Sequence, residues 1–168
     1  HPGLIKELRD VLGLDIAIVG FESGSDKILK ALRKGTTRTI NLEAAKILHK
    51  NNVKIFANIM MGVPGESNED VDLTMSMVRE INPVHFSPAT FSPYPGSDLH
   101  DYCVKNNLVL DEYADRHVGQ KKLRGIDYDY IQKAVDDYSR EKHKLKFWLK
   151  HNNLPLMSTI RKVYRKVR

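Results

Sequence analysis

Cysteine is nearly absent from this chain of 168 residues, in which Cys103 is the only one. A single thiol cannot close an internal disulfide and cannot complete a cysteine metal motif. Long apolar runs are also absent, since no stretch approaches the roughly 18 residues of a membrane-spanning helix. The first ten residues, HPGLIKELRD, lack the apolar stretch of a signal peptide. These absences predict a protein without a membrane span, in a reducing, cytoplasmic setting.

Two common catalytic signatures are missing as well. The sequence contains no GxxxxGK[ST] phosphate-binding loop and no G-x-S-x-G nucleophile elbow. Ser23, which follows an acid at the end of an apolar run, therefore has no nucleophile context.

Charge is distributed unevenly along the chain. Residues 138–168 hold ten Lys or Arg against one acid, whereas residues 1–137 hold 17 basic and 20 acidic side chains. Aromatic residues are interleaved with the basic ones, as stacking on RNA would require. Nucleic acid, an anionic membrane surface or an acidic partner is one explanation of this segment. The explanation that we favour is that its helices pack on the main body and expose their lysines to water.

The apolar pattern predicts alternating strands and helices. Apolar residues make up 41% of the chain, enough for a domain with a core. Helical spacing or short apolar runs predict these elements: helices over 4–12, 25–34 (ended by Gly35), 39–50, from Ser67 onward, 97–105, 127–151 and after Pro155; strands over 15–21, 53–61 and 84–91.

This order is typical of parallel βα units joined by right-handed crossovers. Three strands are too few for a closed barrel, which needs about eight. The predicted fold class is therefore α/β, with three parallel βα units that form part of a barrel and a helical C-terminal extension.

The three loops that follow the predicted strands share their chemistry. They read FESGSD (21–26), MGVPGESNED (61–70) and SPYPGSD (92–98), and each combines an acid with a hydroxyl. Ligands of parallel α/β folds bind at this end of the strands. Carboxylates there suit sugar hydroxyls or an amine better than a phosphate. The alternative is that these acids and serines only cap helices.

Three motifs in order, GFESGSDKILKALRKGTT, IMMGVPGESNEDVDLT and FSPYPGSDL, resemble the radical S-adenosylmethionine (radical SAM) superfamily. The similarity covers about residues 4–106 and looks most like the branch with an upstream cobalamin-binding domain. It implies a partial (βα)₆ barrel of which this chain holds the fourth to sixth strands. The implied organisation is a half-barrel over residues 1–106, a connecting loop region over 107–126 and a basic helical extension over 127–168.

The resemblance also implies residues that bind S-adenosylmethionine. Glu22 and Ser23 match contacts to the ribose, and Lys34 matches a basic residue that meets the methionine carboxylate. The remaining matches lie against the adenine: Ile59, Met60, Met61 and Gly62 on one strand, where the G-x-I-x-G-x-x-E spacing is met only loosely, and Thr90, Phe91 and Ser92 on the next. No catalytic residue and no metal ligand is implied within the chain.

One departure from the family concerns the [4Fe-4S] cluster. The C-x-x-x-C-x-x-C motif that holds it is absent, and a lone Cys103 cannot replace it. We expect the motif before His1 in a longer parent protein, with truncation or proteolysis as the explanation and a degenerate paralogue as the alternative.

The expected function is thus that of the C-terminal fragment of a radical SAM enzyme, of the Fe-S oxidoreductase or methyltransferase type. It would supply the ribose and adenine side of the cofactor site, be inactive alone, and act in the parent on an unidentified substrate, with cobalamin as an optional second cofactor. Expected partners are the missing N-terminal half of the barrel and further copies of the chain at the cut sheet edges. The alternative function is a non-catalytic α/β module that binds RNA or a protein through its basic C-terminal helices.

Overall fold

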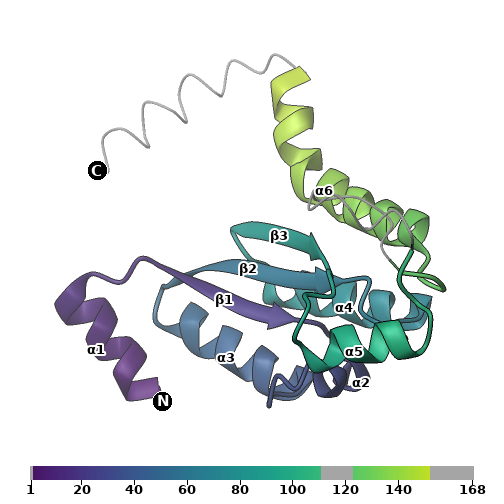
Figure 1. Ribbon diagram of the computed structural model, residues 1–168. Coiled ribbons are helices and arrows are strands. Elements are labelled where there is room, and N and C mark those ends of the chain that lie inside the picture. Colours follow the sequence, from purple (N-terminus) through teal and green to yellow (C-terminus); the bar gives the residue numbers. More distant parts are fainter. Residues whose placement is uncertain (1, 111–122, 152–168) are drawn as a thin grey trace. The chain divides into compact units, whose positions relative to one another are not determined.

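A computed structural model describes residues 2–110 and 123–151 of the chain (Figure 1). The chain divides into two units, residues 1–135 and 136–168. The elements in chain order are α1 (Pro2–Leu12), β1 (Ile16–Glu22), α2 (Asp26–Ala31), α3 (Arg38–Lys50), β2 (Lys54–Met61), α4 (Asn68–Ile81), β3 (His85–Thr90), α5 (Asp98–Lys105) and α6 (Tyr128–His151). All three strands and helices α1 to α5 belong to the first unit.

The three strands form one parallel sheet in the order β1-β2-β3 (Figure 1). Ile18 pairs in register with Phe56 on β2, and Met60 pairs with Ala89 on β3. The predicted α/β class, with parallel strands alternating with helices and a C-terminal helix, is confirmed, and it is consistent with a partial barrel. The helix predicted after Pro155 lies outside the described residues, and the division at residues 106 and 126 stays a prediction.

The two faces of the sheet differ in burial. Along β2 the side chains alternate, and Ile55, Ala57, Ile59 and Met61 are buried on the face covered by α3 and α4 (Figure 1). Phe56, Asn58 and Met60 point to the opposite face and are only partly buried. On the same face of β1, Ile18 is 69% exposed. An interior-facing row of a barrel would have this mixture of apolar and polar side chains.

Helix α2 is shorter than the sequence predicts, because it ends at Ala31 rather than Lys34. The left-handed stop was expected at Gly35, but Arg33 already adopts a φ of 51°. The Lys34 N–H donates to the Leu29 carbonyl and the Arg33 N–H to the Lys30 carbonyl, each over 3.0 Å. These two bonds form a Schellman motif. The early stop releases Arg33 and Lys34 from the helix.

None of the helices in the described part of the chain is long and apolar enough to cross a membrane.

Candidate functional site

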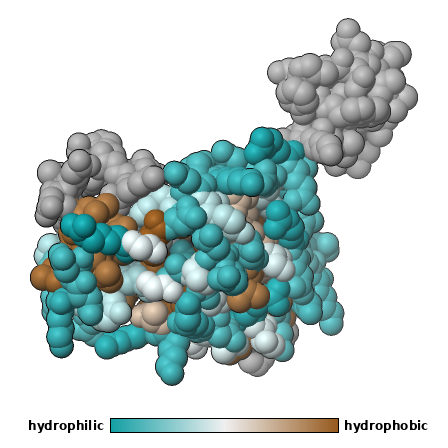
Figure 2. All heavy atoms as spheres, turned by 90° about the vertical axis from the view of Figure 1, so that its right-hand side faces the viewer, coloured by the Kyte–Doolittle hydropathy of each residue, from teal (hydrophilic) through white to brown (hydrophobic). Residues whose placement is uncertain are grey.

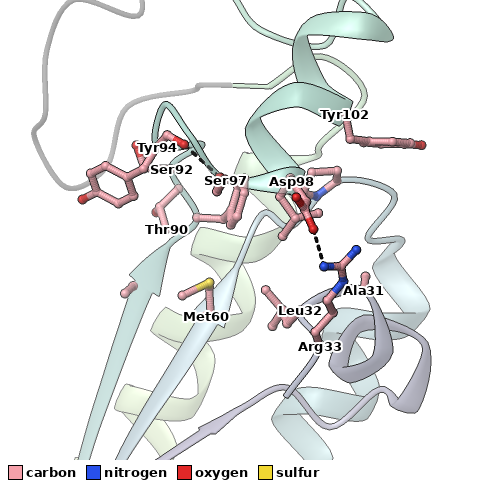
Figure 3. Close-up of a pocket in the computed structure, with 14 residues that line it drawn as sticks. Ala31, Leu32, Arg33, Met60, Thr90, Ser92, Tyr94, Ser97, Asp98 and Tyr102 are labelled. Atoms are coloured by element: carbon pink, nitrogen blue, oxygen red, sulfur yellow. Dashed lines mark hydrogen bonds and ion pairs between the residues drawn. The ribbon is translucent and has the colours of Figure 1, made fainter. Parts of the chain in front are cut away.

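A cavity of about 860 Å³ lies at the carboxyl ends of the strands. Its lining comes from the end of α2, from β2 and the loop after it, from the end of β3 and the segment that follows, and from α5. Met60 and Leu32 point into its middle (Figure 3). Figure 2 views the molecule from the side toward which the strands point, and hydrophobic groups interrupt a mostly hydrophilic surface there. An apolar pocket with a few polar groups at this end of a parallel sheet is the usual form of a ligand site.

Four of the residues that the sequence singled out line this cavity: Met60, Thr90, Phe91 and Ser92. Met60 reaches it because it belongs to the partly buried face of β2 and pairs with Ala89, which also lines the cavity. Strand alternation turns Ile59 and Met61 to the other face, where each is at most 2% exposed. These two therefore pack in the core behind the cavity.

Glu22 and Lys34 are brought together in the structure. Lys34 Nζ lies 3.2 Å from Glu22 Oε1; Glu22 is partly buried, whereas Lys34 is exposed. Glu22 follows a bulge in the β1–β2 pairing and adopts a φ of 64°. Its carboxylate stands over Gly20, where a Cβ would collide with it and would lie 3.3 Å from Lys34 Nζ. The bulge and the glycine thus present a carboxylate and an ammonium at the end of the edge strand.

Ser23 lies away from this pair. Its side chain is fully buried, and its Oγ is 3.0 Å from Thr74 Oγ1 on α4. Ser25 caps α2 by accepting from the Ile28 N–H, as the pattern of the sequence predicts.

Gly62 and Glu66 shape the turn after β2. Gly62 has a φ of 76°, and its N–H donates to Glu66 Oε2 over 2.5 Å. Glu66 is only 7% exposed, and its Oε1 has no hydrogen-bond partner among the described residues. Burial raises the pKa of Glu66 to about 7, and the Asp70 charge adds to this against the lowering effect of the Gly62 N–H. Sequence reasoning treated Glu66 only as one acid of a loop; its burial depends on tertiary packing.

The structure adds polar groups at the mouth of the cavity that the sequence did not single out. Arg33, at the end of α2, forms an ion pair with Asp98 at the start of α5 (Figure 3). The Ser97 hydroxyl donates to the Tyr94 carbonyl over 2.8 Å, while the Tyr94 ring points outward. Asp98 and Ser97 were visible as a helix start, but the approach of Arg33 depends on the early end of α2.

The chain does not fit an iron–sulfur cluster. Cys103 is its only cysteine and is completely buried, where it packs with Ile28, Val63, Phe91 and Leu123. Burial raises the pKa of the thiol, which disfavours the thiolate that a metal needs. Among the described residues no group of three or more His, Cys, Asp or Glu side chains is arranged to hold a metal ion.

An adenosine group suits the cavity better. Met60, Phe91 and Leu32 provide apolar surface for a flat base, and Thr90 and Ser92 provide polar groups nearby. The Glu22–Lys34 pair lies at the end of β1 and is not among the residues that line the cavity. Fold and site thus define an α/β protein with parallel βα units and an apolar, polar-rimmed ligand site at the carboxyl ends of its strands.

Comparison with known proteins agrees with this class. Residues 1–78 match the family model described as the radical SAM superfamily. An uncharacterized methyltransferase of Pyrococcus horikoshii is 26% identical over 161 residues, which cover 91% of this chain and 35% of the relative. A protein of Methanocaldococcus jannaschii, provisionally named a methylthiotransferase, is 39% identical over 109 residues, which cover 64% of this chain and 24% of the relative.

A third relative, the tRNA-2-methylthio-N(6)-dimethylallyladenosine synthase of Nitratiruptor, is 32% identical over 99 residues, or 58% of this chain and 22% of the relative. The chain thus spans about a third or less of the length of these relatives. The family-model match over residues 1–78 and these relatives bear out the likeness to the radical SAM superfamily that the three motifs predict. The likeness to the cobalamin-binding branch stays a prediction.

Proposed function

We propose that this chain supplies the ribose and adenine side of the S-adenosylmethionine site of a radical SAM enzyme. The observation that carries the proposal is the cavity at the carboxyl ends of the strands. Met60 reaches it from β2, and Thr90, Phe91 and Ser92 reach it from the end of β3 and the two residues that follow.

In this proposal each part of the site has its own task. The cavity holds the adenine against Met60 and Phe91, with backbone and hydroxyl groups of residues 90–92 along its edge. The Glu22 carboxylate accepts from the ribose hydroxyls, and the Lys34 ammonium meets the methionine carboxylate. Ser23 contributes by holding the loop, since its hydroxyl is engaged with Thr74. Ile59, Met61 and Gly62 support the wall behind the base.

When held by these residues, S-adenosylmethionine would supply radical chemistry to the parent enzyme. Cluster cysteines would come from another part of a longer parent, so the chain alone is proposed to be inactive. The names of the relatives favour methyl or methylthio transfer as the reaction of that parent. A cytoplasmic setting and cobalamin as a further cofactor belong to the same proposal; among the described residues none is assigned to cobalamin.

Equilibrium binding of S-adenosylmethionine to the chain tests the proposal. We expect saturable binding, weakened roughly tenfold by Glu22→Gln, because a hydrogen bond to a charged acceptor is worth about 1.5–3 kcal/mol. Glu43→Gln, at an exposed position of α3, is the matched control and should bind as the wild type does. Absence of saturable binding by the folded wild-type chain would refute the proposal.

RNA is the second candidate ligand, as substrate of the parent or as partner of a non-catalytic module. Two observations favour it: the tRNA product in the name of the Nitratiruptor relative, and the ten basic residues in 138–168. Binding of a tRNA transcript that weakens steeply between about 50 and 200 mM salt would support this candidate. Binding that is equally weak for the chain with and without residues 138–168 would count against it.

A further inference from the structure

The loop that follows β1 is attached to α4 by hydrogen bonds shielded from water. Ser23, Ser25 and Thr74 are at most 2% exposed, and Asp70 is 6% exposed. The Gly24 N–H donates to Thr74 Oγ1 over 3.0 Å, and Ser25 Oγ donates to Asp70 Oδ1 over 2.6 Å. Buried polar groups that are bonded in this way fix the loop in one conformation.

The Thr74 hydroxyl uses its whole hydrogen-bonding capacity in this contact. It donates to the Asp70 carbonyl over 2.9 Å and accepts from the Gly24 N–H. Because its single proton is engaged, Ser23 must be the donor in the 3.0 Å contact between the two hydroxyls. A valine of the same shape would leave the Ser23 hydroxyl and the Gly24 N–H buried without an acceptor.

Asp70 connects the same loop to the loop that follows β2. Its Oδ2 accepts from the Ser67 N–H and hydroxyl over 2.9 Å each, and its carboxylate pairs with Lys27. Lys27 Nζ in turn donates to the Gly65 carbonyl over 3.0 Å. Burial raises the pKa of Asp70, but the hydrogen bonds from Lys27, Ser25 and Ser67 outweigh it and lower that pKa to about 2. The carboxylate is therefore charged at neutral pH.

The backbone conformation of Glu22 needs support from the residues around it. Its φ of 64° is costly for a residue with a side chain and persists only where the surroundings enforce it. Close packing against α4 fixes the backbone just after Glu22, since a Cβ on Gly24 would collide with the Leu73 carbonyl oxygen.

We propose that Thr74 and Asp70 are positioning residues, which hold the loop of residues 23–25 on α4 and thereby keep the Glu22 carboxylate over Gly20. This inference rests on the proposed function, in which that carboxylate meets the ribose. Neither residue touches the cavity, so both act through the loop.

The test compares Thr74→Val, Thr74→Ser and Thr39→Val in the whole chain. Thr39 lies exposed on α3 and gives the matched control. We expect Thr74→Val to weaken S-adenosylmethionine binding roughly tenfold, because it leaves buried polar groups of the loop without their hydrogen bonds. Thr74→Ser should stay within about twofold of the wild type, because it keeps the hydroxyl. Circular dichroism at the assay temperature shows which variants are folded.

A folded Thr74→Val variant that binds as the wild type does would overturn the inference. If Thr74→Val does not fold, Ser23→Ala takes its place, since it removes the donor to Thr74 and the acceptor of the Ser25 N–H. Ser23→Ala should also weaken S-adenosylmethionine binding, and an unchanged affinity would again overturn the inference.

A second readout separates this inference from the proposed function. If the wild type does not bind S-adenosylmethionine, the proposed function fails, while amide exchange and carbon-13 NMR of the Glu22 carboxyl still test the positioning. Thr74→Val should speed exchange of the Gly24 amide at least about tenfold and shift the Glu22 signal, and Thr74→Ser should do neither. Thr74→Val data identical to those of the wild type would contradict the inference.

Discussion

Gly20 and Gly24 lie four residues apart at the end of β1, and each lacks a side chain for a different physical reason. At Gly20 the space is taken by the far ends of two flexible side chains, Glu22 and Lys34. At Gly24 it is taken by the backbone of α4, with Thr74 Cα 2.7 Å from the position of a Cβ. The two side chains beside Gly20 can move aside, whereas the backbone beside Gly24 cannot.

Gly20→Ala should therefore change binding rather than stability. The added methyl group displaces the Glu22 carboxylate and the Lys34 ammonium from the carboxyl end of β1, and we expect S-adenosylmethionine to bind several-fold more weakly. Urea unfolding followed by circular dichroism should show a midpoint close to that of the wild type. Wild-type affinity in this variant would mean that the placement of the pair over Gly20 does not matter.

Gly24→Ala is the contrasting substitution. Because backbone must shift to admit the methyl group, we expect a loss of about 1–3 kcal/mol in the free energy of unfolding. The same urea titration measures it. A midpoint no lower than that of Gly20→Ala would contradict the close packing of the loop on α4.

Glu66 gives the chain a distinctive dependence of stability on pH. Its pKa is about 7 in the folded chain against an ordinary value of 4.5, so the folded state holds the extra proton between these values. The free energy of unfolding should thus fall by about 3 kcal/mol as pH rises from about 4.5 to 7. Asp70, whose pKa is lowered to about 2, acts in the opposite sense, and its contribution is lost as pH falls below about 4.

Urea titrations between pH 4 and 8 measure this dependence. We expect Glu66→Gln to flatten the slope between pH 5 and 7, because the amide keeps an acceptor for the Gly62 N–H but does not titrate. The exposed Glu43→Gln should keep the wild-type slope. Equal slopes in the wild type and Glu66→Gln would show that the carboxyl does not bind the proton.

Among the elements, the strands and most helices could be predicted from the sequence, while the end of α2 could not. Helices α4 and α5 begin after Ser67 and Ser97, whose side chains cap them as the sequence pattern predicts. Helix α3 begins after Thr37, whose capping role the predicted start at residue 39 missed. The end of α2 depends on Arg33 in a left-handed conformation that local preference assigns to glycine. That departure helps to place Arg33 on the cavity and Lys34 beside Glu22.

The outer edges of β1 and β3 have no further strand beside them within the described residues. Unpaired edges of a parallel sheet favour association between copies, and the exposed Ile18 adds apolar surface on β1. We therefore expect sedimentation velocity to show dimers or larger species at high concentration. Ile18→Lys should reduce them, whereas Ile40→Lys, at an exposed site on α3, should not. A stable monomer at all concentrations would contradict this expectation.

For the whole molecule, the sequence predicted the parallel sheet correctly, and of the binding residues that it predicts, four line the cavity: Met60, Thr90, Phe91 and Ser92. Alternation along β2 was sufficient to identify a strand, yet it did not tell which of Ile59, Met60 and Met61 faces the cavity; the structure assigns Met60 to it. The buried hydroxyl of Ser23 and the buried carboxyl of Glu66 also depend on contacts with distant residues. Local patterns locate a loop, and packing decides which of its side chains are accessible.

The most direct test of the account is a titration of the chain with S-adenosylmethionine, observed in the methyl signals of carbon-13-labelled methionines. Met60 points into the cavity, whereas Met61, Met75 and Met77 are at most 2% exposed in the core. The account predicts a saturable shift of the Met60 methyl signal, assigned by its absence in Met60→Leu, with little change at the three buried methionines. A Met60 signal that does not move at high S-adenosylmethionine concentration would contradict the proposed cofactor site.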